Sequence, residues 1–155
     1  AYTGSFTVYA AAGGAASSVT VDLSNTYQNW SKRNFELNGL DLSKHQLIRA
    51  DAFAYLKQAV FAQEWFDLIV LDPPSFSNSA KMLDILDVQQ DHAFLIAQCM
   101  RLLSPQGLLI FSNNLRSFKL GEEVSQHYKV KEVSATSVPP DFRNKKIHRC
   151  WYIQH

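Results

Sequence analysis

Short apolar runs alternate with amphipathic stretches along most of the chain. Runs rich in β-branched and apolar residues predict strands, and apolar positions that recur every three or four residues predict helices. The expected strands cover residues 18–21, 46–50, 66–71, 108–112, 128–136 and 150–153. The expected helices cover about 6–12, 25–38, 53–60 and 88–103, with one more between residues 112 and 128.

This alternation predicts a doubly wound α/β fold, because parallel strands joined by helical crossovers form a sheet that is covered on both faces. The segment 105–107, Pro-Gln-Gly, is expected to turn the chain into a strand that is buried on both faces. The last two strands are joined by a loop without a helix, so we expect an antiparallel hairpin near one edge. Residues 1–155 show no repeat or linker, and we expect them to form a single domain.

The chain opens on a turn that leads directly into a helix, Ala1-Tyr2-Thr3-Gly4-Ser5. Such a turn normally follows a strand. We therefore expect the first, central strand of the sheet to be missing and the sequence to be a fragment of a longer polypeptide with upstream domains. Gly4 stands where backbone could approach a ligand at a helix N-terminus, although a lone glycine is weak support.

Three acidic residues, Asp22, Asp51 and Asp72, end three successive predicted strands. Ligands of an open parallel sheet bind beyond the carboxyl ends of its strands. We therefore expect the three carboxylates to line one crevice, where they could accept hydrogen bonds from a ribose diol or an adenine amino group. The alternative is that each aspartate caps the helix that follows it.

The sharpest local motif is Leu71-Asp72-Pro73-Pro74-Ser75-Phe76. Two prolines after an apolar strand fix the backbone torsion φ. Phe76 then lies beside a rigid turn where its ring could stack on a flat base, an interaction worth ~1–3 kcal/mol. Asp72 and the Pro73 carbonyl supply acceptors. The alternative is a turn with a buried phenylalanine.

The formal net charge of +1 does not indicate which class of molecule the chain binds. A nucleic-acid binder of this composition must therefore concentrate its basic residues locally. Residues 141–149 carry four positive charges against one negative charge, and phosphate contacts there would position RNA without reading its sequence. A solvated hairpin loop is the alternative. The candidate RNA-binding residues are Lys81, Arg116, Lys119, Arg143, Lys145, Lys146 and Arg149.

Cys99 and Cys150 show no metal-ligand or disulfide spacing, so we expect two reduced thiols and no metal site. No apolar run approaches the ~20 residues that span a bilayer. The N-terminus does not resemble a signal peptide, and a cytoplasmic protein is the default expectation.

We expect several aromatic and histidine residues to have structural roles. Tyr27, Trp30 and Phe35 are interpreted as the core and rim of a helix rather than as a stacking surface. His92 follows Asp91 in a predicted helix, and pairing on the helix surface is expected rather than catalysis.

Taken together, the motifs resemble the class I S-adenosylmethionine-dependent ribosomal RNA methyltransferases. More narrowly, the chain is similar to the C-terminal half of the bifunctional family that methylates two guanines of large-subunit ribosomal RNA. In that family this half makes N7-methylguanine. The motifs that carry the resemblance include Tyr2-Thr3-Gly4-Ser5-Phe6, Val21-Asp22-Leu23-Ser24, Asp51-Ala52-Phe53, Leu71 to Ser79, Phe111-Ser112-Asn113-Asn114 and Ile147-His148-Arg149-Cys150-Trp151.

The resemblance implies a Rossmann-like sheet of seven strands with the last strand antiparallel. It also implies roles for individual residues. The implied cofactor-binding residues are Tyr2, Thr3 and Gly4 near the methionine part, Asp22, Leu23 and Ser24 near the ribose, and Asp51, Ala52 and Phe53 around the adenine. Asp72, at the third strand end, is a further cofactor-binding candidate, because it could accept from the adenine amino group. The implied catalytic residues, which hold the target base, are Asp72, Pro73, Pro74 and Phe76.

The implied reaction is a direct displacement at guanine N7, which has a lone pair and no proton to lose, so no general base is required. Methylation of cytosine C5 is disfavoured, because it needs a cysteine nucleophile and Ser112-Asn113-Asn114 follows the strand where that residue is expected. Methylation of an exocyclic amino group and an RNA-binding fragment without activity remain alternatives. A nicotinamide dehydrogenase is weakened by the absence of a G-x-G-x-x-G motif.

Overall fold

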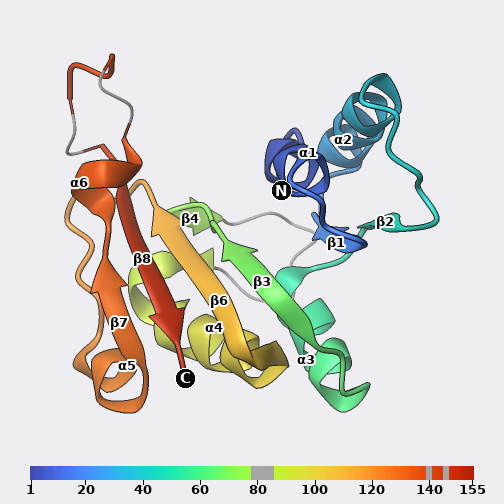
Figure 1. The fold of residues 1–155 in the computed structure, drawn as a ribbon. Helices are drawn as coiled ribbons and strands as arrows, with labels where there is room; N and C mark the ends of the chain where they lie inside the picture. The colour runs from blue at the N-terminus through green and yellow to red at the C-terminus, as the bar shows by residue number, and fades with distance from the viewer. Residues whose placement is uncertain (78–85, 139–140, 145–146) are drawn as a thin grey trace. The chain divides into compact units, whose positions relative to one another are not determined.

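A computed structural model describes residues 1–77, 86–138, 141–144 and 147–155 of the chain. The chain divides into two units, Ala1–Tyr55 and Leu56–His155. Figure 1 colours the first unit from blue to cyan and the second from green to red. Helices and strands alternate through both units, as the sequence predicts for an α/β fold.

The first unit is built around a parallel pair of strands joined by a helix. Its elements are α1 (Ser5–Ala12), β1 (Ser18–Val21), α2 (Asn25–Leu37) and β2 (His45–Ile48). Ser18 lies opposite His45 in the ladder, and Val21 lies opposite Ile48. Ser24 caps α2 by accepting a hydrogen bond from the Tyr27 backbone N–H at 3.3 Å, so the predicted helix start is confirmed.

Close packing between α1 and α2 requires glycine at position 4. Gly4 has a φ of 71°, which a residue with a side chain rarely adopts. A Cβ atom there would lie 2.9 Å from Phe35 Cε1 and from Ser31 Cβ. Phe35 is fully buried and forms part of the core of this unit. The need for Gly4 therefore arises from its contact with α2, a reason that the sequence did not suggest.

The second unit contains a mixed four-stranded sheet in the order β3-β6-β8-β7. Its strands are β3 (Phe66–Leu71), β6 (Leu103–Asn113), β7 (Lys129–Glu132) and β8 (Arg149–Gln154). β3 and β6 are parallel, whereas β8 runs antiparallel to both of its neighbours, β6 and β7. Figure 1 shows these four strands side by side. The expected antiparallel pair at the end of the chain is confirmed, with β7 at the edge.

Two details of this sheet differ from the prediction. The segment 105–107 is a bulge within β6 instead of a turn, because Phe66 lies opposite Leu103 while Leu68 lies opposite Leu108. The connection from β7 to β8 contains a short helix, α6 (Ser134–Ser137). It forms because the Val133 carbonyl accepts hydrogen bonds from two backbone N–H groups of the next turn. The expected strand 128–136 therefore ends at Glu132.

The predicted polar loop after β3 contains a short strand. β4 (Phe76–Ser77) pairs antiparallel with β5 (Leu86–Asp87), which leads directly into α4 (Val88–Leu102). Asp87 caps α4 by accepting from the Gln89 N–H at 2.9 Å, and Asp91 accepts from the Asp87 N–H at 2.8 Å.

The core of the second unit lies between the sheet and α4. Leu95 and Ile96 of α4 are buried, as are Phe111 of β6 and Trp151 of β8. The Phe111 and Trp151 rings stack with centroids 5.6 Å apart. The remaining helices are α3 (Ala52–Phe61), which contains the boundary between the units, and α5 (Glu122–His127).

Among the described residues, the strands form three separate sheets. The strand expected ahead of residue 1 stays a prediction. In the part of the chain that the structure describes, no helix has the length and apolar character needed to cross a membrane.

Candidate functional site

Asp22 follows β1 directly, and backbone nitrogens surround its carboxylate. Oδ2 accepts from the nitrogens of Ala1 at 2.6 Å and Tyr2 at 3.0 Å, and Oδ1 accepts from the Ser24 N–H at 2.8 Å. A carboxylate offers about four acceptor positions, so about one remains for a ligand. The side chain is 14% exposed, which leaves this position open to a small molecule.

The surroundings of Asp22 keep it ionised near neutral pH. Burial tends to raise the pKa of Asp22, but hydrogen bonds from the nitrogen of Ala1 and from the Ser24 and Tyr2 amides outweigh burial. The net effect is a pKa below its ordinary value of 3.8. An ionised acceptor of this kind suits the hydroxyl donors of a ribose.

Side chains from α2 fix the loop at residues 2–4. Ser31 Oγ donates to the Tyr2 carbonyl at 3.0 Å, and Asn34 Nδ2 donates to the Thr3 carbonyl at 2.8 Å. The Asp22 carboxylate binds the same loop through the Tyr2 N–H. The first unit therefore brings the predicted residues Tyr2, Thr3 and Asp22 together on one side of α2.

Asp51 acts as a helix cap. Its Oδ1 accepts from the Ala54 N–H at 3.1 Å, at the start of α3. The capping alternative therefore applies to Asp51, although one carboxylate can cap a helix and contact a ligand. Ala52 is exposed and Phe53 half-buried at the same helix start. Their contact with an adenine ring stays a prediction, as does that of Leu23, whose carbonyl accepts from Arg49 Nε at 3.4 Å.

Asp72 has a different environment at the end of β3. Its Oδ1 accepts from Ser112 Oγ at 2.7 Å, across from the neighbouring strand β6. Residues 73–75 are not helical, so the capping alternative is wrong for Asp72. Cys150 lies opposite Ser112 on β8, which places three polar side chains in a row across three strands.

Phe76 displays its ring at the surface. The side chain is 58% exposed, so the alternative of a buried phenylalanine is wrong. Phe76 lies opposite Asp87 in the β4–β5 ladder, and the Ser75 carbonyl accepts from the Val88 N–H at 3.2 Å. These contacts fix the turn after Pro73 and Pro74 to the start of α4.

Gln89 and His92 of α4 hold the loop at residues 114–121, and we call this pair the clamp. The sequence did not reveal this arrangement. Gln89 makes two hydrogen bonds with the Lys119 backbone, one to its carbonyl and one from its N–H, both at 2.9 Å. His92 Nε2 accepts from the Gly121 N–H at 2.9 Å, and its Nδ1 bonds to the Gln89 carbonyl at 2.9 Å. His92 is only 3% exposed and packs against Phe118, so the expected pairing on the helix surface is wrong.

The candidate RNA-binding residues differ in their surroundings. Arg116 and Lys119 are exposed on the loop that α4 clamps, and Arg143 is also exposed. Arg149 forms an ion pair with Glu132 at 3.0 Å and lies over the Trp151 ring, 5.2 Å from its centroid. Lys81, Lys145 and Lys146 lie outside the described residues. RNA contact by all of them stays a prediction.

A cavity of about 490 Å³ lies near Arg149 and is also lined by Lys119 and Glu132. Its lining does not include Asp72 or Phe76, the residues predicted to hold the base. We therefore base the candidate site on the strand-end residues.

The two cysteines are poor nucleophiles. Burial raises the pKa of the Cys99 thiol to about 12, and Cys99 is 1% exposed within α4. Burial and the nearby Asp72 charge also raise the pKa of Cys150. Both thiols are therefore protonated at neutral pH, which agrees with the expectation that cytosine C5 chemistry is disfavoured.

The predicted site residues fall into two groups. The first unit contains Tyr2, Thr3, Gly4, Asp22, Leu23, Ser24, Asp51, Ala52 and Phe53, and the second contains Asp72, Pro73, Pro74 and Phe76. The meeting of both groups around one crevice stays a prediction.

Comparison with known proteins gives concordant matches. A family described as S-adenosylmethionine-dependent methyltransferase matches residues 1–146, which include parts of both units. Ribosomal RNA large subunit methyltransferase K of Neisseria meningitidis is 66% identical over 99% of this chain and 44% of that protein. Ribosomal RNA large subunit methyltransferase K/L of Marinobacter nauticus is 53% identical over 99% of this chain and 21% of that protein.

Solved structures agree with these matches. A protein described as a methyltransferase and crystallised with SAH has a TM-score of 0.86 and 30% identity, over 99% of this chain and 43% of that chain. A protein from Streptococcus mutans, described as a SAM-dependent methyltransferase, has a TM-score of 0.80 and 30% identity, over 99% of this chain and 42% of that chain. The chain therefore spans less than half the length of each of these four relatives. The chain belongs to the S-adenosylmethionine-dependent methyltransferase family.

Proposed function

We propose that this chain transfers a methyl group from S-adenosylmethionine to guanine N7 of large-subunit ribosomal RNA. The observation that carries the proposal is the 66% identity, over 99% of the chain, with a relative named ribosomal RNA large subunit methyltransferase K. The choice of N7 rests on the resemblance to the guanine-N7 half of the bifunctional enzymes.

The first unit supplies the residues that would hold the cofactor. The ionised Asp22 carboxylate keeps about one acceptor position for a ribose hydroxyl. The fixed loop at residues 2–4 would contact the methionine part, and Asp51 with Phe53 would flank the adenine. S-adenosylmethionine, when bound, supplies an electrophilic methyl group.

The second unit supplies the residues that would hold the base. The exposed Phe76 ring suits stacking, which is worth ~1–3 kcal/mol for a base. Asp72 donates no proton when ionised and accepts one hydrogen bond from Ser112, so acceptor positions remain for the N–H groups of guanine. Guanine N7 is an acceptor on a different edge of the base from its amino group. Contacts between Asp72 and the N–H groups would therefore leave N7 free to react.

Positioning is the main contribution that the chain needs to make. Guanine N7 loses no proton on methylation, so no general base is required. Holding the base against the methyl donor is a proximity effect, and such effects lower barriers by as much as ~7–11 kcal/mol. The buried, protonated state of Cys99 is compatible with this chemistry because no covalent intermediate is needed.

The basic side chains would orient the RNA. Arg116 and Lys119 share one clamped loop, so their phosphate contacts would be positioned together. Such contacts fix register and orientation without reading bases.

The test uses the complete protein, methyl-labelled S-adenosylmethionine and unmodified large-subunit ribosomal RNA. After transfer, the RNA is digested and the labelled nucleoside is identified. We expect label in N7-methylguanosine. Label on an exocyclic nitrogen or on cytosine C5 would contradict the proposed target atom.

A further inference from the structure

Three aromatic side chains gather at the surface of the first unit. Tyr2, Tyr27 and Trp30 are 57%, 37% and 46% exposed. The Tyr2 ring lies 5.0 Å from the Tyr27 ring and 5.7 Å from the Trp30 ring, centroid to centroid, at interplanar angles of 72° and 56°. Tyr2 meets Tyr27 edge to face, an arrangement that aromatic pairs favour, and it is tilted against Trp30. Adjacent exposed rings of this kind mark an interaction surface.

The backbone fixes the position of Tyr2 in this cluster. Tyr2 has a φ of 53°, which costs a residue with a side chain about 1–3 kcal/mol and persists only when neighbouring contacts enforce it. The enforcing contacts are present, because the Tyr2 N–H donates to Asp22 and its carbonyl accepts from Ser31 Oγ. The cluster is therefore held by contacts of its backbone, and the ring of Tyr2 is directed into it.

The charges around the cluster favour a polyanion. Arg33 is exposed and lies one turn beyond Trp30 on the same face of α2, since residues three apart on a helix are neighbours. Arg49 is also exposed and donates to the Leu23 carbonyl, next to Asp22.

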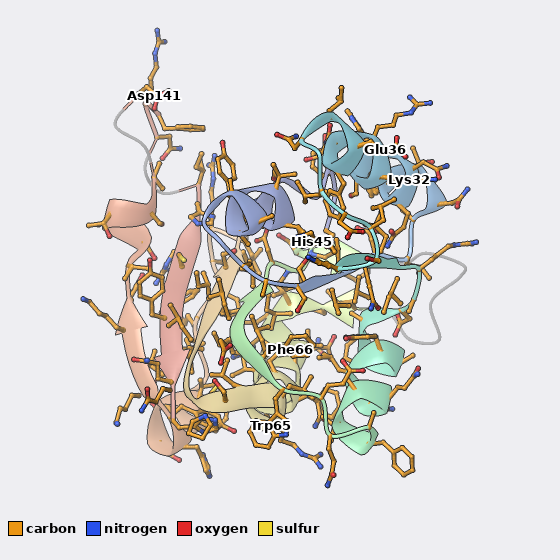
Figure 2. All side chains as sticks on the ribbon, turned by 45° about the vertical axis from the view of Figure 1, so that its right-hand side comes forward. Lys32, Glu36, His45, Trp65, Phe66 and Asp141 are labelled. Atoms are coloured by element: carbon orange, nitrogen blue, oxygen red, sulfur yellow. The ribbon has the colours of Figure 1, made fainter. Side chains whose placement is uncertain are left out.

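The acidic side chain of α2 lies away from the rings. Glu36 pairs with Lys32 at 3.9 Å, and at roughly 100° of rotation per residue both lie on the side of the helix opposite Trp30. Figure 2 shows Lys32 and Glu36 together on α2. Glu36 is also three residues from Arg33, but Lys32 balances its charge, so α2 keeps the net positive charge of Arg33 next to Trp30.

We propose that Tyr2, Tyr27 and Trp30 form a stacking platform for unpaired bases of single-stranded RNA, with Arg33 and Arg49 contacting the adjoining phosphates. This inference rests on the proposed RNA substrate and adds a second contact region, on the unit that does not contain Phe76. Stacking on aromatic rings is worth ~1–3 kcal/mol per base and tolerates any sequence, because every base has a flat face. The platform holds RNA flanking the target and does not select the target guanine.

The test measures binding of the full chain to a fluorescent oligouridine and to an abasic oligonucleotide of the same length. The variants are Trp30→Ala, Trp30→Phe and Tyr27→Ala. Tyr9→Ala is the matched control, since Tyr9 is 78% exposed on α1 outside the cluster. We expect Trp30→Ala to weaken oligouridine binding about 5- to 150-fold and Trp30→Phe to restore most of it. Affinity for the abasic probe should not change.

Unchanged oligouridine binding in both alanine variants would overturn the platform, as would an equal loss with the abasic probe. A loss of SAH affinity with unchanged RNA binding would assign the rings to the cofactor instead.

Thermal unfolding of each variant detects a folding defect. If Trp30→Ala does not fold, the Trp30→Phe and Tyr27→Ala variants still test whether the rings bind bases. If the wild type binds through Trp30 but labels an atom other than N7, the proposed function fails and the platform stands. If the wild type labels N7 while Trp30→Ala binds normally, the platform alone fails.

Discussion

Replacing Asp22 with asparagine tests the cofactor site at its best-defined residue. The carboxylate accepts three hydrogen bonds from backbone nitrogens, of Ala1 and Tyr2 on Oδ2 and of Ser24 on Oδ1. An asparagine side chain keeps one oxygen and replaces the other with an NH2 group, which cannot accept. If its oxygen retains the Ser24 contact, the NH2 group faces the Tyr2 N–H. The open acceptor position is on Oδ1, so the variant keeps a neutral acceptor there, loses the negative charge, and leaves the Tyr2 N–H without an acceptor.

The size of the effect follows from the one acceptor position that the backbone leaves free. A hydrogen bond to a charged acceptor contributes ~1.5–3 kcal/mol. A bond to the neutral asparagine oxygen contributes ~0.5–1.5 kcal/mol, so the substitution loses about 1–1.5 kcal/mol, which corresponds to about 5- to 13-fold weaker binding of SAM or SAH. We expect the Asp22→Asn variant to show a loss in this range.

Isothermal titration calorimetry with SAH measures this loss directly. Asp41→Asn is the matched control, because Asp41 also accepts from the backbone two residues ahead, at 2.9 Å from the Ser43 N–H, and is not a predicted ligand contact. Equal SAH affinity of the wild type and Asp22→Asn, with both proteins folded, would refute the assignment of Asp22 to the ribose.

The same variant makes a pH prediction for stability. The pKa of folded Asp22 lies below its ordinary value of 3.8, so its contribution to stability is fully present above that value. The contribution is lost as the pH falls through the folded pKa. The stability advantage of the wild type over Asp22→Asn, measured by urea unfolding, should therefore be constant near neutral pH and shrink below about pH 3.8.

Three further predictions concern the second unit. Phe76→Ala removes an exposed stacking ring and should raise KM for RNA about 5- to 150-fold with little change in Tm, whereas Phe61→Ala, at a side chain 91% exposed on α3, should change neither. His92→Phe keeps a ring against Phe118 but leaves the Gly121 N–H without its acceptor, so urea unfolding should show a loss of ~1–3 kcal/mol; unchanged stability would contradict the clamp. The thiol of Cys99 is buried with its pKa raised to about 12, so it should resist iodoacetamide at pH 8 until the protein unfolds, and rapid labelling of the folded chain would contradict that burial.

The sequence predicts features that depend on neighbouring residues. Ser24 was expected to cap α2, and it does, because a cap depends on residues within one turn. The strand over 66–71 was expected from its continuous apolar run, and β3 has the same bounds. The antiparallel end of the sheet followed from the order of strands and helices along the chain.

Features that depend on distant residues were missed. The burial of His92 depends on the Gly121 N–H, 29 residues away in the sequence. The bulge in β6 depends on how β3 pairs with it, which the Pro-Gln-Gly segment does not reveal. Phe35 lies in the core and Tyr27 and Trp30 are partly exposed, as expected for the core and rim of α2, but the contact of both rings with Tyr2 was not expected.

The candidate site also combines features that depend on neighbouring residues with features that depend on distant ones. The positions of Asp22 and Asp72 directly after β1 and β3 followed from the pattern of apolar runs, whereas Asp51 lies three residues beyond the end of β2, at the start of α3. Their partners did not, because the Ser112 hydroxyl reaches Asp72 from 40 residues away and the Tyr2 amide reaches Asp22 from 20 residues away. A carboxylate at a strand end can cap a helix, hold a loop or contact a ligand, and the tertiary structure decides which.

In the proposed mechanism, Asp22 and Asp51 hold the methyl donor while Asp72 and Phe76 hold a guanine against it. A crystal structure of the complete protein with SAH and guanosine monophosphate tests it most directly. We predict the ribose of SAH at the Asp22 carboxylate, the guanine ring on Phe76, and N7 directed at the sulfur atom. SAH bound away from Asp22, or a base held elsewhere than at Phe76, would contradict the account.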